Sequence, residues 1–123
     1  MLCHESGLHE FDPGRDVKGF AFGDELAPGI VAQEMGAICP DDSALQIRVG
    51  AGALALADGV VDWGGGNVGF VPDRFMDDPP KVKDGIRASV RRLAELDFES
   101  VLFAHGDPIV GEGRAALHSF LEQ

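Results

Sequence analysis

A helix that leads into a buried strand, over residues 79–104, constrains this fold more than any other segment. Apolar residues recur there at spacings of three and four, which predicts a helix with one apolar face. These residues are Val82, Ile86, Val90, Leu93 and Leu96. Asp78 stands before the segment as an N-cap, and the run SVLFA at 100–104 has the length and apolar character of a buried strand. A helix connected in this way must lie on a sheet, so the segment predicts a layered fold of helices and strands.

Alternating side chains predict further strands before this helix. In SALQIRV, residues 43–49, apolar and polar residues alternate as they do on a strand with one buried face. GALALAD, residues 52–58, follows a glycine-rich turn, and stretches at 17–22 and 29–35 predict two more strands, with a last helix from about Gly113. We expect the inner face of the sheet to carry Leu45, Ile47, Leu54 and Leu56. This order of elements predicts an α/β (α+β) fold, with one mostly antiparallel or mixed sheet and helices on one face.

The composition is that of one globular domain, residues 1–123, in which residues 1–16 are expected to be loosely ordered. The net charge is −11, from 21 acidic and 10 basic residues, which disfavours nucleic acid and anionic membrane surfaces as partners. No apolar run reaches the roughly 18 residues needed to span a bilayer, and the start has no signal-peptide pattern. Cys3 and Cys39 form no disulfide or zinc-binding pattern, so we expect a cytoplasmic protein.

Two side chains that follow predicted strands are candidates for chemistry. Asp58 ends the strand at 52–58, and His105 follows the strand at 100–104. A carboxylate and an imidazole are ordinary ligands of zinc, iron or manganese, but a zinc site needs three or four ligands. Alternatively, Asp58 forms an Asp-Gly turn and His105 is bonded to backbone groups. The chain lacks the Gly-x-Ser-x-Gly motif of a nucleophile elbow and the Lys-Ser/Thr of a phosphate loop. The sequence therefore gives no sign of a serine hydrolase or of a phosphate-binding loop as an alternative to a metal site.

Three features in the second half of the chain occur together. They are a small, apolar strand that ends in Asp58, a glycine-rich loop followed by the helix at 79–96, and His-Gly-Asp-Pro-Ile at 105–109. In this combination the chain resembles the C-terminal half of the metallo-β-lactamase fold, a group of hydrolases with a binuclear metal site. The likeness covers roughly residues 17–123 and is stronger after residue 50. It implies that Asp58 bridges two metal ions and that His105 ligates one of them, so that a shared water ionises near neutral pH.

The chain departs from this family in its N-terminal part. The family motif His-x-His-x-Asp-His is absent, because His4 and His9 stand five residues apart with no Asp-His after them; we expect both at the surface. In the turn at 36–40, Ala37 occupies the position of another family histidine and cannot ligate a metal. Replacement ligands, which could equally form a plain turn, are Cys39, Asp41 and Asp42. The resemblance therefore implies an incomplete zinc, iron or manganese site, or no metal at all.

The resemblance also implies half of an αββα sandwich. In the family, two sheets pack against each other through their inner faces, and helices cover their outer faces. This chain corresponds to one of these sheets with its helices. An uncovered inner face would be a sticky apolar patch, so we expect a homodimer or other oligomer in which a second copy covers the exposed sheet face. Alternatively, the chain is a fragment, from a truncated gene or from a late start codon at Met1.

Two functions are compatible with these residues. We expect a truncated or degenerate relative of the metallo-β-lactamase-like hydrolases, with an incomplete metal site and no strong hydrolase activity as an isolated chain. Such a protein would persist as a dimeric scaffold or interaction module. The alternative is an active metal-dependent hydrolase of an ester, thioester, lactam or phosphoester, whose site is completed by a dimer partner or by replacement ligands. Trp63 and Phe70 are candidates to line a substrate groove, unless they pack beneath the glycine-rich loop.

Overall fold

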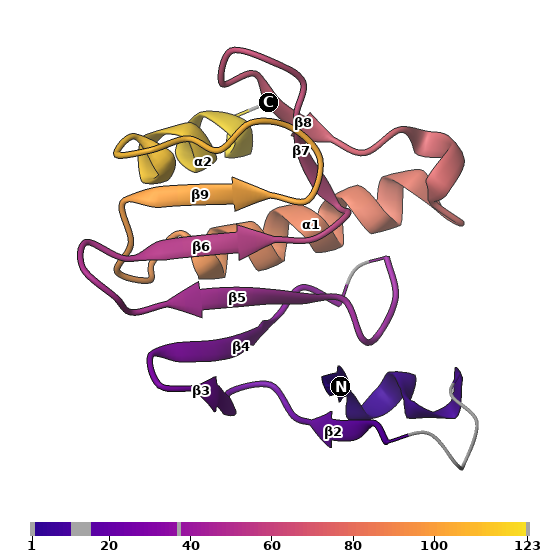
Figure 1. Ribbon diagram of the computed structural model, residues 1–123. Helices are drawn as coiled ribbons and strands as arrows, with labels where there is room; N and C mark the ends of the chain where they lie inside the picture. The colour runs from indigo at the N-terminus through magenta and orange to yellow at the C-terminus, as the bar shows by residue number, and fades with distance from the viewer. Residues whose placement is uncertain (1, 11–15, 37, 123) are drawn as a thin grey trace.

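Five strands form the central sheet, in the spatial order β3-β4-β5-β6-β9 (Figure 1). The computed structural model describes residues 2–10, 16–36 and 38–122. Neighbouring strands are antiparallel except β6 and β9, which run parallel. The strands are β3 Glu25–Ala27, β4 Ile30–Glu34, β5 Ser43–Ile47, β6 Ala53–Leu56 and β9 Ser100–Phe103. The predicted α+β fold with a mostly antiparallel, mixed sheet is confirmed.

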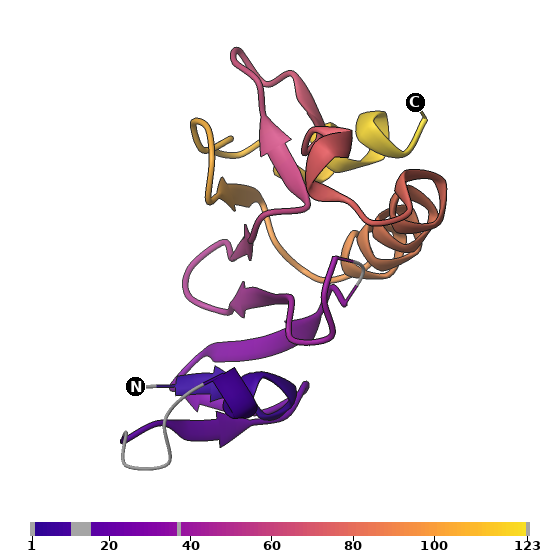
Figure 2. The same ribbon diagram turned by 90° about the vertical axis from the view of Figure 1, so that its right-hand side faces the viewer.

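Two helices cover one face of this sheet, and the other face is open (Figure 2). α1 spans Pro79–Leu93 and α2 spans Gly113–Leu121, close to the two predicted helices. Asp78 caps α1 as expected, because its side chain accepts a hydrogen bond from the Lys81 backbone N–H at 3.5 Å. Between the helices and the sheet, the fully buried side chains include Leu54, Ile86, Val90, Leu93, Phe98, Val101, Leu117 and Phe120. The helices are therefore held on the sheet by an apolar core.

Strand β6 faces the opposite way from the prediction, which placed Leu54 and Leu56 on the uncovered inner face together with Leu45 and Ile47. In the ladder with β6, Gln46 pairs with Leu54, whereas Leu45 pairs with Ala55, so Leu45 and Leu54 lie on opposite faces of the sheet. Leu54 and Leu56 are buried under the helices, while Leu45 and Ile47 are half-buried on the open face. The expectation that Leu45, Ile47, Leu54 and Leu56 share one face was therefore wrong.

The helix-facing side of β5 carries Ala44 and Gln46, since Leu45 and Ile47 lie on the open face. Both residues are buried, and Ala44 is fully so. The side-chain oxygen of Gln46 accepts a hydrogen bond from the side-chain amide of Gln33 on β4, at 3.0 Å. A buried amide with a partner costs little, so the polar residues of this strand can lie inside while its larger apolar residues lie on the open face.

The N-terminal residues form a small unit beside the sheet. β1 (Leu2–His4) pairs in parallel with β2 (Lys18–Phe20), and a short 3-10 helix, η1, spans Glu5–Glu10. His4, expected at the surface, is instead buried: its ring stacks on Phe22 with centroids 4.0 Å apart. His9 is exposed, as predicted. Part of the segment expected to be loosely ordered, residue 1 and residues 11–15, lies outside the described residues.

A hairpin after β6 was not predicted from the sequence, which indicated only a glycine-rich loop before the helix at 79–96. β7 (Val60–Asp62) pairs with β8 (Val68–Phe70), and a 3-10 turn, η2 (Asp73–Phe75), leads from β8 towards α1. The connection between the two strands contains glycines with positive φ, which other residues adopt only with strain. Among the described helices, none combines the length and apolar character that a membrane crossing requires.

Candidate functional site

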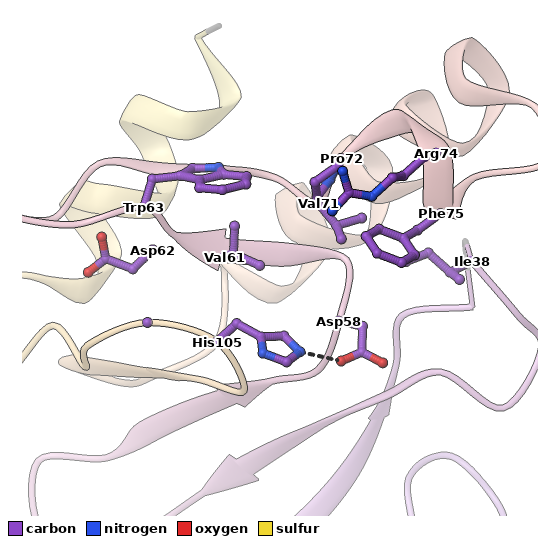
Figure 3. A pocket seen from close by; sticks show the side chains of 11 residues that line it. Ile38, Asp58, Val61, Asp62, Trp63, Val71, Pro72, Arg74, Phe75 and His105 are labelled. Carbon is purple, nitrogen blue, oxygen red and sulfur yellow. Dashed lines mark hydrogen bonds and ion pairs between the residues drawn. The ribbon is translucent and has the colours of Figure 1, made fainter.

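Asp58 and His105 lie side by side at one end of the central sheet (Figure 3). The parallel strands β6 and β9 place Leu56 opposite Phe103, and each candidate residue follows its strand by two positions. The register of the sheet therefore brings together two side chains that are 47 residues apart in the sequence. The Nε2 atom of His105 and the Oδ1 atom of Asp58 are 3.2 Å apart. The two ligands implied by the family resemblance thus form a pair.

The loop after β9 holds His105 in this position. The backbone carbonyl of His105 accepts a hydrogen bond from the Asp62 N–H at 3.2 Å, which ties the loop to β7. Val101 and Ile109 form a bridge at the base of the loop. Gly106 has a φ of 111°, and a Cβ atom there would collide with the backbone carbonyl of Asp62. Glycine at this position therefore permits the close approach to β7 that positions His105.

An open pocket of about 690 Å³ adjoins the pair. In Figure 3, Asp58 and His105 lie on one side, and the segment before α1 lies on the other with Trp63. The apolar lining consists of Ile38, Val61, Trp63, Val71, Pro72 and Phe75. Trp63 and Phe75 are each 58% exposed, although both are large aromatic residues. The volume lies within the range of roughly 300–1,000 Å³ that is usual for small-molecule sites.

The ionisable side chains of the pocket differ in how they are partnered. Asp58 is paired with His105, and the side chain of Asp62 accepts a hydrogen bond from the Gly64 N–H at 2.9 Å. The guanidinium of Arg74 lies over the ring of Phe75, 5.0 Å from its centroid. It forms no ion pair with any carboxylate in the described part of the chain. Among the described residues that line the pocket, Arg74 is therefore a charged side chain that contacts an aromatic ring and has no carboxylate partner.

The candidate replacement ligands lie on the turn before β5. Cys39 is exposed, and partial desolvation, followed by the influence of Asp41 and Asp42, raises the pKa of its thiol to about 11. This thiol is therefore protonated at neutral pH, which makes it a poor nucleophile. Asp42 is buried, and its Oδ2 atom has no hydrogen-bond partner among the described residues. Ala37, which stands where the family has a histidine, lies outside the described residues.

The two residues suggested for a substrate groove lie in different surroundings. Trp63 lines the pocket, as Figure 3 shows. Phe70, the last residue of β8, is half-buried and packs on Phe120 with ring centroids 4.8 Å apart. Lys83 and Arg87 of α1 lie over its ring. Phe70 is not part of the pocket lining, whereas Arg74 and Phe75, which the sequence did not single out, are.

Asp58 and His105 do not make a complete metal centre on their own. Within residues 2–10, 16–36 and 38–122, no three histidine, cysteine, aspartate or glutamate side chains are grouped closely enough to hold a metal ion. A catalytic zinc site takes three protein ligands, and this pair supplies two. The side chains of Asp58 and His105 are 71% and 67% exposed, so water would fill the other positions of a bound metal. The pair fits weak metal binding and does not fit a tight binuclear centre.

No protein-family model matches the sequence, and no curated protein does. The relation to the metallo-β-lactamase fold therefore stays a prediction that depends on the sequence features described above.

Proposed function

We propose that this chain is a relative of the metallo-β-lactamase-fold hydrolases that keeps a two-ligand remnant of the metal site and has no strong hydrolase activity on its own. The observation that carries the proposal is the Asp58–His105 pair at the ends of two adjacent parallel strands. The implied family roles of these residues, a bridging carboxylate and a ligating imidazole, require the two side chains to be close together. Their separation of 3.2 Å is consistent with that requirement.

The small number of ligands argues against strong catalysis. Metal affinity falls when protein ligands are missing, and a loosely held metal leaves its water poorly positioned for attack. Asp58 and His105 together could hold one zinc, iron or manganese ion, which would lower the pKa of a bound water. With two ligands we expect this binding to be weaker than about 1 μM.

The alternative is an active metal-dependent hydrolase of an ester, thioester, lactam or phosphoester. Two observations favour it. Both side chains of the pair are mostly exposed, so a second chain could reach them. Asp42 has a buried oxygen with no hydrogen-bond partner in the described part of the chain, and it lies near enough to Asp58 for their charges to interact, so a small movement of its turn could supply another ligand. Cys39 and Asp41 lie on the same turn.

The proposed partner is a second copy of the chain on the open face of the sheet. The side chains on this face alternate with those that pack under α1 and α2, and they are apolar in the middle strands. They include Leu45, Ile47, Ala53, Ala55 and Leu102. Leu102, on the edge strand β9, is 37% exposed on this face. We further propose a cytoplasmic setting, since the two cysteines are free thiols.

Metal uptake tests this function directly. The protein is purified without chelator or metal-affinity resin, and its zinc content is measured by elemental analysis before and after titration with zinc. We expect less than about a tenth of an equivalent as purified, and weak uptake of about one equivalent on titration. His105→Ala and Asp58→Asn should each abolish the uptake. His118→Ala, which removes an exposed imidazole on α2, is the matched control and should leave it unchanged.

The other outcomes separate the two functions. Two tightly held equivalents in the wild-type protein, together with hydrolysis of an ester or phosphoester that depends on His105, would favour the active enzyme. Zinc uptake that survives both His105→Ala and Asp58→Asn would contradict both functions, because the metal would then bind elsewhere.

A further inference from the structure

The pocket beside Asp58 and His105 has the properties of a binding site for a small organic molecule, whether or not a metal is bound. Exposed apolar side chains that gather in one patch mark ligand or interaction sites, and Trp63 and Phe75 both face this space (Figure 3). They come from separate segments, the end of β7 and the turn η2, and converge on one cavity. Val61 and Val71, which are buried, complete an apolar surface behind them. An apolar body of a ligand would be desolvated on this surface.

The polar groups in the same cavity determine which charge a ligand can carry. The Oδ1 atom of Asp58 lies 3.2 Å from the Nε2 atom of His105, and the side chain of Asp62 accepts a hydrogen bond from the Gly64 N–H. Arg74 has no carboxylate partner among the described residues, although the chain has 21 acidic and only 10 basic residues. By comparison, Lys83 and Arg87 on the neighbouring helix pair with Asp73 and Asp84, at 2.9 Å and 3.1 Å. Within the described lining, the cavity therefore offers Arg74 as a cation at the edge of an apolar surface.

We propose that this pocket binds a small organic carboxylate with an apolar, preferably aromatic, body. The carboxylate lies on the guanidinium of Arg74, which can bind it through two parallel hydrogen bonds. The apolar body lies against Trp63 and Phe75, which offer faces for stacking. The ligand carries a single negative charge, because the net charge of −11 repels polyanions and Arg74 is the one cation without a carboxylate partner among the described residues that line the cavity. Binding of this ligand does not depend on a metal at Asp58 and His105.

Intrinsic fluorescence gives a specific readout, because Trp63 is the only tryptophan of the chain and there is no tyrosine. The probe is 4-phenylbutyrate, which does not absorb at the wavelength that excites tryptophan. Its uncharged counterpart, 4-phenylbutanamide, has the same shape. Both are titrated in the presence of EDTA, so that metal content does not affect the result. For the carboxylate we expect a saturable change in Trp63 emission with a Kd of about 0.1–1 mM, and for the amide about tenfold weaker binding.

Substitutions at position 74 distinguish recognition of the carboxylate from a structural role. Arg74→Gln should weaken carboxylate binding about tenfold and leave amide binding unchanged, whereas Arg74→Lys, which keeps the charge, should retain most of the affinity. Arg91→Gln, at an exposed position on α1 outside the pocket, is the matched control and should bind like the wild type. Equal affinity for the two probes would overturn the proposal, as would an equal loss for both probes in Arg74→Gln. Absence of a saturable change with either probe would also overturn it.

Discussion

The carboxylates of Asp42 and Asp58 interact through their charges, although they lie on different turns of the chain. Burial, followed by the charge of Asp58 and then that of Asp41, raises the pKa of Asp42 from its ordinary 3.8 to about 6. The folded protein therefore holds a proton on Asp42 over a pH range in which the unfolded chain has lost it. The stability that this proton contributes is fully present below about pH 4 and is lost as the pH rises through 6.

We predict that Asp42→Asn removes this part of the pH dependence. With allowance for solvent screening, the variant should exceed the wild type in free energy of unfolding by about 1–2 kcal/mol at pH 8 and differ little at pH 4. Urea unfolding at several pH values measures the difference. Asp77→Asn, which removes an exposed carboxylate, should follow the wild-type profile at every pH. A constant difference between Asp42→Asn and the wild type would show that Asp42 does not titrate in this range.

A second prediction concerns the hydrogen bond that ties α1 to the end of β4. The buried hydroxyl of Ser89 donates to the carbonyl of Met35 at 2.7 Å, and the Met35 N–H in turn donates to the Asp42 carbonyl at 3.0 Å. Ser89→Ala would leave the Met35 carbonyl without this donor, so we expect a loss of about 1–2 kcal/mol in the free energy of unfolding. Urea unfolding of Ser119→Ala, at an exposed position on α2, should differ from the wild type by less than about 0.5 kcal/mol. Equal stability of the two variants would contradict a structural role for this bond.

The sequence predicts the elements with strong periodicity and misses those without it. The apolar stripe and Asp78 located α1, and alternation located β5 and β6. The hairpin of β7 and β8 was missed because its strands are short and a glycine-rich segment joins them. The predicted orientation of β6 was wrong because alternation shows that a strand has two different faces, but not which face the helices cover. Here Leu54 and Leu56 lie under the helices, whereas Leu45 and Ile47 lie on the open face.

The candidate site was predictable to a similar degree. Asp58 and His105 follow apolar strands, and a carboxylate or imidazole at such a position is a recognisable signal. Arg74 and Phe75 gave no such signal, because a 3-10 turn has no periodicity that would show that it folds back over the ends of β6 and β9. His4 was misplaced for a related reason: its burial depends on stacking with Phe22, a contact between distant residues that composition does not reveal.

The third prediction tests the loop that positions His105. Gly106 combines a φ of 111° with close contact to the Asp62 backbone, so Gly106→Ala introduces both backbone strain and a collision. We expect a loss of about 2–4 kcal/mol in the free energy of unfolding, measured in urea, and a change in Trp63 emission as the loop moves. Gly111→Ala is the matched control: its φ is 84° but no atom lies within 4 Å of the added Cβ. It should lose only about 1 kcal/mol, through strain alone. Equal losses would show that the loop does not depend on contact with Asp62.

The last prediction concerns the open face of the sheet and the second copy proposed to cover it. Light scattering after size-exclusion chromatography at micromolar concentration should give twice the mass of the chain. Leu102→Glu places a charge on the open face, where desolvation of a carboxylate opposes association, and should give a monomer with an unchanged circular dichroism spectrum. Ala115→Glu places the same charge at an exposed position on α2, which covers the opposite face, and should remain a dimer.

A monomeric wild-type protein would contradict the proposed dimer outright. Dissociation by both substitutions would locate the interface elsewhere, because a contact confined to the open face cannot be sensitive to a charge on α2.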